Sequence, residues 1–405
     1  MTGSLLQLVT IGEQDKHFIG NPQISYFKTA FKQHTNFAME SLPLYFKEEC
    51  DFGRKSECII SKKGDLLNKL FLEINLPKIN TPNVSWINDI GNFIIDYVEI
   101  NIGGVTIDRH YGHYLDLYSE LNLPESIKVG YNEMVYKQGF YTNISQSNEI
   151  KLIIPLFFWF CNSISNSLPL IALQYHDVKL NVKFKNFKEC IFSGQNIDQI
   201  NNLEELHFKN TILFGDFIFL DNKERSSFAK SDHQYLIEQV QYSNYNNIVS
   251  RESIINIDLH FNLPIKEILW YIQNTNVLSN NDWSNYSNTP HNILGLTENK
   301  EILKEATIYI NGQERFHPRD AKYFRLIQPY SHHTSIPKNF IYSYSFGLYP
   351  EKNQPSGTMN FSRIDNSRLY LKCIDDINPS NIYIFAINYN ILIIKNGMGG
   401  LKFST

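Results

Sequence analysis

The chain has 405 residues, a net charge of −4 and only 19% charged residues. It is too apolar to be a disordered chain, and it lacks the basic excess that nucleic-acid binding needs. The length is ample for two cores of ordinary domain size, and the 28 Phe and 24 Tyr residues suit half-buried pleated surfaces. We therefore expect an all-β protein that does not bind nucleic acid.

The opening residues have weak periodicity and predict an N-terminal arm over residues 1–25, with a short helix over 23–33 that begins after Pro22. Apolar and polar residues then alternate in the pattern of β-strands. The strands of the first half are predicted within 57–63, 67–77, 96–102, 105–110 and 215–220. A charged helical segment follows Asp221, whose side chain can cap it, and we place the linker there.

The second half repeats this plan. Strands are predicted within 254–261, 267–273, 306–312, 339–349, 368–373 and 381–394. Residues 274–299 are rich in Asn, Ser and Thr and predict a long surface loop. About eight short strands per half indicate an eight-stranded sandwich in each half.

Two pairs of segments suggest that the same β-rich unit occurs twice. Residues 96–118 and 305–327 both predict a strand, a tight Gly-bearing turn, a second strand and a short helix. Residues 175–184 match 366–373 in pattern and in relative position. The offset between the copies is the length of a whole domain rather than of a solenoid repeat.

The cysteines and the N-terminus bear on the cellular compartment. The five cysteines are scattered without a CxxC pair, so we expect reduced thiols and no zinc ribbon. The N-terminus has no basic region followed by an apolar core, so we expect no secretory signal. The longest apolar run, residues 152–161, is too short to cross a bilayer. We expect a protein made in the cytoplasm.

Several long segments resemble the major capsid proteins of nucleocytoplasmic large DNA viruses. The similar segments occur in order along the chain, at residues 5–41, 168–180, 216–241, 345–371 and 387–405. The resemblance implies two tandem eight-stranded jelly rolls, a double jelly roll, with short helices in the corner loops. We expect an arm over 1–25, a first jelly roll over 26–222 and a second over 223–405.

The resemblance also implies a function. Three chains would form a homotrimeric, pseudo-hexagonal capsomer that tiles the icosahedral capsid of a virion, without catalysis, cofactor or metal. Its partners would be copies of itself, neighbouring capsomers and minor capsid proteins beneath the shell, the last through the arm, with no nucleic acid and no direct membrane insertion. The chain is short for this family, which leaves a minor capsid or assembly-scaffold paralogue as the alternative.

Two histidine pairs could suggest a metal site. His110 and His113 have metal-like spacing, but no acidic residue shares an obvious face with them, and a stacked His-Tyr surface at a strand-to-helix corner explains them better. His332 and His333 are expected in a loop between two prolines, where adjacent side chains on an extended chain point apart. We therefore predict no metal site.

Other site-like features are weak. A cupin-like metalloenzyme would need inward-facing His and carboxylate residues, whereas the inward positions of the predicted strands are apolar. Ser345 and Ser362 lack the G-x-S-x-G context of a nucleophile, and the glycine cluster at 397–400 indicates a flexible exit for the tail.

Two further interpretations concern surface residues. Arg363 and Asp365 form the best polar pair, for which we expect a structural role in a corner loop near a subunit contact. Trp283 and Tyr286 could form a sugar-binding platform on the predicted loop, although ordinary loop aromatics are the simpler interpretation.

Overall fold

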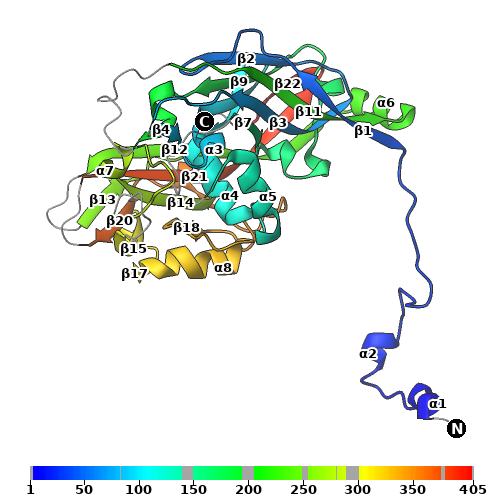
Figure 1. Cartoon of the computed structure of the whole chain (residues 1–405). Coiled ribbons are helices and arrows are strands. Elements are labelled where there is room, and N and C mark those ends of the chain that lie inside the picture. Colours follow the sequence, from blue (N-terminus) through cyan, green and yellow to red (C-terminus); the bar gives the residue numbers. More distant parts are fainter. Residues whose placement is uncertain are drawn as a thin grey trace. The chain divides into compact units, whose positions relative to one another are not determined.

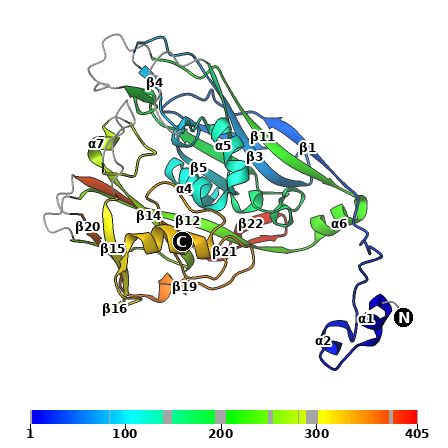
Figure 2. The same cartoon turned by 60° about the horizontal axis from the view of Figure 1, so that its bottom comes forward.

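The computed structural model in Figures 1 and 2 describes residues 3–82, 84–138, 149–193, 205–248, 254–279, 281–288, 301–374 and 379–403. The chain forms two compact units, Met1–Phe37 and Ala38–Thr405. Among these residues, no helix is both long enough and apolar enough to span a bilayer.

The first unit contains two short helices, α1 (Gly3–Val9) and α2 (Lys16–Ile19). The helix predicted over 23–33 is wrong, since these residues form only turns and irregular backbone. The Ser25 hydroxyl accepts a hydrogen bond from the amide of Phe27 at 3.3 Å. Such local bonds compete with helix formation, and a short isolated helix is marginal in water.

The second unit contains two β-sandwiches, called barrel 1 and barrel 2. The first sheet of barrel 1 has the order β1 (Phe37–Leu44), β11 (Asn210–Leu220), β3 (Leu66–Leu76) and β7 (Ile150–Pro155), with β8 (Leu168–Pro169) beside β3. Its second sheet has the order β2 (Lys55–Ile60), β9 (Val178–Phe184), β5 (Ile95–Ile102) and β6 (Val105–Tyr111). A small ladder joins β4 (Val84–Trp86) to β10 (Ile191–Ser193). The described residues of this barrel also include the α-helices α3 (Ile90–Phe93), α4 (Gly112–Asn122) and α5 (Glu125–Val135). Short 3-10 helices lie at Trp159–Cys161, Ile164–Asn166, Leu170–Ala172 and Phe187–Glu189.

Barrel 2 repeats the arrangement. Its first sheet has the order β12 (His233–Ile248), β21 (Ser380–Lys395), β14 (Pro264–Asn274) and β18 (Tyr342–Ser345), with β19 (Met359–Asn360) beside β14 and β22 (Met398–Leu401) beside β21. The second sheet has the order β13 (Ile254–Asp258), β20 (Ser367–Cys373), β15 (Leu303–Ile310) and β16 (Gln313–Glu314), with β17 (Arg319–Asp320) beside β15. Its helices are α7 (Thr275–Leu278), a π-helical turn (Tyr323–Ile327) and α8 (Gln328–His332). Helix α6 (Asn222–Lys230) lies between the barrels in the chain and contacts barrel 1, where Arg225 pairs with Asp65 at 3.0 Å.

The two barrels match strand for strand in their pairing order, which confirms the predicted double jelly roll. The two pairs of segments predicted to be repeated occupy corresponding strands: β5 and β6 correspond to β15 and β16, and β9 corresponds to β20. The match extends to irregularities, because the ladders of β3 with β11 and of β14 with β21 each skip one residue at the same point, Asn68 in β3 and Lys266 in β14.

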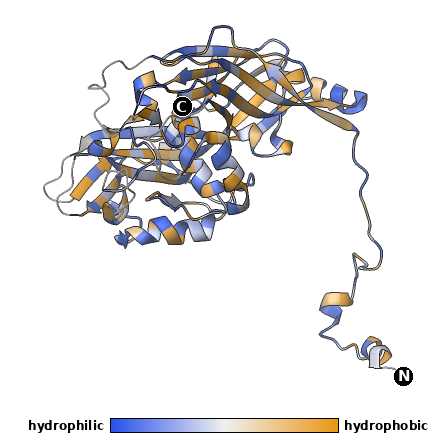
Figure 3. Cartoon of the chain, viewed as in Figure 1, coloured by the Kyte–Doolittle hydropathy of each residue, from blue (hydrophilic) through white to orange (hydrophobic). Residues whose placement is uncertain are grey.

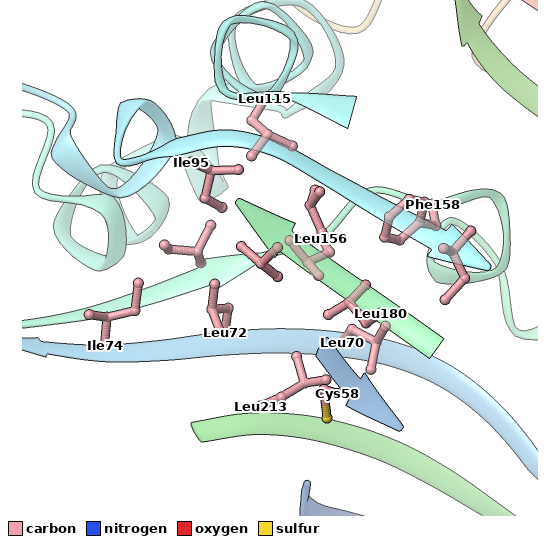
Figure 4. Close-up of a cluster of buried hydrophobic side chains, with 14 of the residues drawn as sticks. Cys58, Leu70, Leu72, Ile74, Ile95, Leu115, Leu156, Phe158, Leu180 and Leu213 are labelled. Carbon is pink, nitrogen blue, oxygen red and sulfur yellow. The ribbon is translucent and has the colours of Figure 1, made fainter. Parts of the chain in front are cut away.

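Each barrel contains an apolar core, and the core of barrel 1 also takes in Ile237, Leu392 and Ile394 from strands β12 and β21 of barrel 2. Figure 4 shows part of the first, in which Leu70, Leu72 and Ile74 of β3 alternate with less buried residues. Leu180 of β9 belongs to the same cluster, and Leu115 of α4 lies in it beside Ile95. The second core is built around Trp270, Phe324 and Leu369. Full burial of one such side chain is worth about 1.5–3 kcal/mol. The inward positions are apolar, as predicted.

The helix predicted after Asp221 is present as α6, and Asp221 Oδ1 accepts a hydrogen bond from the amide of Glu224 at 2.8 Å. The flexible tail predicted at 397–400 is wrong. Asn396 and Gly397 have φ values of 51° and 78° and turn the chain back into strand β22. A Cβ at Gly397 would lie 2.6 Å from the Tyr175 ring, so this turn needs glycine.

The surface loop predicted over 274–299 is also wrong in its described part, because residues 281–288 are almost entirely buried. Their polar side chains bond to barrel 1: Asn281 Nδ2 donates to the carbonyl of Ile191 at 2.8 Å, and Trp283 Nε1 donates to that of Glu189 at 2.9 Å. Residues 289–299 lie outside the described part.

Candidate functional site

The structure separates the two histidines with metal-like spacing. His110 Nε2 lies 2.8 Å from Asp108 Oδ2, and its ring stacks on Phe158. His113 points to barrel 2, where its Nδ1 lies 2.7 Å from the hydroxyl of Tyr271. Both lie at the predicted strand-to-helix corner, but they are buried rather than on a surface. No group of three or more His, Cys, Asp or Glu residues in the described ranges could hold a metal ion.

The second histidine pair does not lie on an extended loop as predicted. His332 ends α8 and its Nδ1 lies 3.0 Å from the carbonyl of Leu348. The His333 side chain is buried between Glu267 Oε2 at 3.2 Å and Glu351 Oε1 at 3.1 Å. Burial would lower the pKa of His333, but the two carboxylates outweigh it and raise the pKa to about 9. The imidazolium therefore serves as a structural cation.

The remaining sequence candidates do not form a site. Arg363 and Asp365 are both exposed, and none of the described ion pairs joins them. Tyr286 is buried, so a sugar platform built on it is wrong. The hydroxyl of Ser362, in the 3-10 helix Phe361–Arg363, accepts a hydrogen bond from the amide of Leu263. The hydroxyl of Ser345, at the end of β18, donates to the carbonyl of Gly347.

The second unit contains an extensive buried contact between the two barrels. Helix α4 of barrel 1 lies on the outer face of the β12-β21-β14 sheet of barrel 2 (Figure 2). It begins at Gly112, where a Cβ would lie 2.4 Å from the carbonyl oxygen of Ile95, so the helix starts close to the strand. From there α4 turns one face toward barrel 2 and presents Leu115 to the core of barrel 1.

The apolar part of this contact joins three residues of α4 to a row of side chains on β14 and β21. The members are Tyr114, Leu117 and Leu121 from α4, with Leu269, Tyr271, Tyr383, Phe385 and Ile387 from barrel 2. All are buried. Helical spacing on one side and strand alternation on the other place these side chains face to face.

Backbone and side-chain hydrogen bonds extend the contact along the sheets. Asp108 Oδ1 accepts a bond from the amide of Val240 at 3.0 Å, which connects β6 to β12. Strand β22 reaches barrel 1 as well, since His176 Nδ1 lies 3.0 Å from the carbonyl oxygen of Gly399. The C-terminal hairpin thereby holds the two barrels together.

A buried charge cluster lies at the same junction. Lys137 Nζ lies 2.5 Å from Asp116 Oδ1 and 2.7 Å from Glu120 Oε1. Burial acts to lower the pKa of Lys137, but the carboxylates of Asp116, Asp89 and Glu120 raise it well above its usual value. The hydroxyl of Tyr286, from barrel 2, donates to Asp116 Oδ2. The cluster thus connects both barrels through largely buried polar groups.

A second buried cation lies nearby. Lys185 Nζ lies 3.6 Å from the ring centroid of Trp283, in cation–π geometry. Burial lowers the pKa of Lys185 to about 8. The sequence predicted neither the cation–π contact of Lys185 nor the interface formed by α4. The duplicated segments would have allowed the two copies of the corner helix to be compared.

Comparison with known proteins gives concordant matches. A family model described as "Major capsid protein N-terminus" matches residues 25–221, and one described as "Large eukaryotic DNA virus major capsid protein" matches residues 224–400. The chain is 36% identical to the major capsid protein of Pyramimonas orientalis virus and 34% identical to that of Phaeocystis pouchetii virus, with 100% of both chains covered in each case.

A solved structure is similar too. The quasi-atomic model of the PBCV-1 virus capsid matches with a TM-score of 0.81 and 30% identity, over 94% of this chain and 100% of that chain. The comparison with the Phaeocystis pouchetii virus protein extends over 521 residues, against 405 in this chain, so that relative carries insertions which this chain lacks.

Proposed function

Since the chain belongs to the family of major capsid proteins of large eukaryotic DNA viruses, we propose that it forms a homotrimeric, pseudo-hexagonal capsomer that tiles an icosahedral shell. This is a family of structural proteins, and the chain is not an enzyme. The proposed partners are two further copies of the chain and the neighbouring capsomers.

The observation that carries the proposal is the strand-for-strand duplication held in one block by the α4 contact. Two equivalent barrels per chain give six lobes in a ring of three chains. A closed ring of this kind needs a heterologous contact that closes after three copies. A six-lobed block tiles a hexagonal facet while its loops remain free to differ between the two lobes.

We also propose the domain bounds 1–25, 26–222 and 223–405. The family matches over 25–221 and 224–400 support the division between the barrels. The sheets support it too, because no described strand of one barrel pairs within a sheet of the other.

The arm is the proposed contact to minor capsid proteins beneath the shell or to a neighbouring capsomer. Residues 3–37 are all exposed, and α1 and α2 carry apolar side chains (Figure 3). Leu5, Leu6, Leu8 and Val9 of α1 are exposed, and so is Ile11, which follows it. Exposed apolar segments of this kind mark interaction sites. We place synthesis and assembly in the host cytoplasm.

A minor capsid or assembly-scaffold paralogue is the second candidate. It is favoured because this chain lacks the insertions of the Phaeocystis pouchetii virus protein. Copy number in purified particles separates the two. A dominant shell protein is expected to be the most abundant protein of the particle, whereas a low copy number would support the paralogue. Electron microscopy of the isolated protein tests the capsomer: a six-lobed hexagonal outline is expected, and a two-lobed monomer would contradict it.

A further inference from the structure

The corner helices of the two barrels have very different surroundings. In barrel 1, α4 covers the outer sheet face of barrel 2. In barrel 2, the corresponding π-helical turn and α8 leave Ile327 and Tyr330 54% and 79% exposed. Two equivalent elements thus differ in whether a sheet covers them.

The equivalence can be followed residue by residue. The ladders fix the equivalence, because Tyr97 pairs with Tyr111 in barrel 1 as Glu305 pairs with Asp320 in barrel 2. At the offset between Tyr111 and Asp320, Leu115 corresponds to Phe324, and both lie in an apolar core. At the same offset the residues of α4 that face barrel 2 have counterparts that are exposed or half-buried. Tyr114, Leu117 and Leu121 correspond to Tyr323, Leu326 and Tyr330, and Tyr118, which packs at the edge of the contact, corresponds to Ile327.

The sheet face covered by α4 also has a counterpart. The first two residues of β3 pair with β8, just as the first two residues of β14 pair with β19. The next residue of each strand, Asn68 in β3 and Lys266 in β14, is the one that the ladder to the neighbouring strand skips. This register makes Phe71 equivalent to Leu269 and Glu73 equivalent to Tyr271. Through the ladders to the next strand, Phe214 and Ile212 of β11 are equivalent to Phe385 and Tyr383 of β21.

The two faces differ in burial as the helices do. In barrel 2, Leu269, Tyr271, Tyr383 and Phe385 are buried beneath α4. In barrel 1, Phe71, Glu73, Ile212 and Phe214 are only half-buried. Each chain therefore contains one helix packed on a sheet face. It also contains an equivalent helix that is exposed and an equivalent sheet face that is only half-buried.

We infer that the segment from Tyr323 to Tyr330 of one copy covers the outer face of β3 and β11 of the next copy, in the arrangement that α4 adopts on β14 and β21. The occupant is a second copy of this chain, and the inference rests on the proposed trimer. Three contacts within chains would then alternate with three between chains around a closed ring.

Charge supports this pairing. Within the chain, His113 meets the hydroxyl of Tyr271. The counterpart of His113 is Lys322, which is exposed, and the counterpart of Tyr271 is Glu73. Glu73 has an ion pair with Lys151 at 2.9 Å, and Lys322 of the next copy would add a second cation. Opposite charges thus lie at the positions that the intrachain contact brings together.

The first test compares two equally exposed apolar residues. Ile327→Asp should raise the concentration at which half of the chains are trimeric by about tenfold or more, since a charge would replace an apolar side chain in the contact. The control Val105→Asp changes a residue that is 51% exposed at the tip of the β5–β6 hairpin, outside the proposed contact, and should leave trimerisation unchanged. Sedimentation at a series of concentrations measures both.

Charge reversal gives a test that does not depend on apolar packing. Glu73→Lys and Lys322→Glu should each weaken the trimer, and the double variant should recover most of the loss. Circular dichroism and melting of each variant confirm that the barrels are folded. Additive single effects without recovery, or trimers unaffected by Ile327→Asp, would overturn the proposed contact.

These outcomes distinguish a failure of the proposed contact from a failure of the proposed capsomer. A wild-type chain that is trimeric together with variants that trimerise normally would remove this contact and leave the proposed function standing. A monomeric wild-type chain would overturn both.

Discussion

His113 Nδ1 of barrel 1 and the hydroxyl oxygen of Tyr271 of barrel 2 lie 2.7 Å apart in the buried interbarrel contact. Burial, with a contribution from Lys185, holds the pKa of His113 well below its usual value, so the imidazole is neutral. Burial also raises the pKa of Tyr271 well above its usual value, so the phenol keeps its proton. The tyrosine hydroxyl therefore donates and the imidazole nitrogen accepts.

Tyr271→Phe should lower the free energy of unfolding by about 1–3 kcal/mol, because it leaves the buried Nδ1 of His113 without its donor. Denaturant unfolding followed by fluorescence measures the change. Tyr175→Phe, at an exposed tyrosine, is the matched control and should have little effect. Equal effects of the two substitutions would contradict the assigned role of this hydrogen bond.

Lys137→Met should destabilise the fold by about 3–5 kcal/mol, since it leaves the buried carboxylates of Asp116 and Glu120 without their cation. Lys183→Met removes a solvent-exposed pair with Asp96 and should cost at most about 1 kcal/mol. Thermal and urea unfolding of both variants provide the comparison. A Lys137→Met protein as stable as the Lys183→Met protein would show that the buried cluster contributes nothing specific.

The pKa of His333 predicts a pH dependence. Since it is raised from 6.5 to about 9 in the folded state, its contribution is fully present below about pH 6.5 and is lost as the pH rises through about 9. The rise in the pKa corresponds to roughly 3 kcal/mol of stability. Lys185 acts in the opposite sense, because its lowered pKa of about 8 makes folding more favourable as the pH rises from there to about 10.5.

The free energy of unfolding of the wild type is therefore compared with that of His333→Gln from pH 6 to pH 10. The stability advantage of the wild type should be largest at the acidic end and should shrink toward pH 10. A difference that stays constant with pH would show that His333 does not carry the charge assigned to it.

Removal of residues 1–20 should leave the trimer and its melting temperature unchanged but should reduce the yield of shells. Burial of the five apolar side chains of this segment in a partner could contribute several kcal/mol per contact, at about 1.5–3 kcal/mol each. Replacing Leu5, Leu6 and Leu8 by Ser in the full-length chain is the matched variant and should have the same effect. Loss of trimerisation would place the arm in the trimer itself, and normal shell yield would show that the arm is dispensable.

Much of the fold could be predicted from the sequence, because strand alternation is a local property. The pattern of β3 and the paired segments around β5 and β15 are visible in single stretches of chain. The buried segment 281–288 was not predictable in this way, since Asn281 and Trp283 have a loop-like composition and are buried only because barrel 1 supplies carbonyl acceptors. Strand β22 was missed because its glycines indicate flexibility until Tyr175 is known to lie against the turn.

The interbarrel contact was missed for a related reason. The apolar face of α4 has the spacing of any core-facing helix, and nothing local tells whether Tyr114 or Leu115 faces its own barrel. The answer depends on which sheet the helix meets, and that is a tertiary property. Comparison of α4 with its counterpart in barrel 2 supplies the missing information once the register of both barrels is known.

The most direct test of the account is the mass of the purified chain in solution. Light scattering at micromolar concentration should give three times the 47.3 kDa of a single chain. A trimer of this mass is what a subunit with two equivalent barrels requires to form a six-lobed block. A stable monomer under the same conditions would contradict the capsomer.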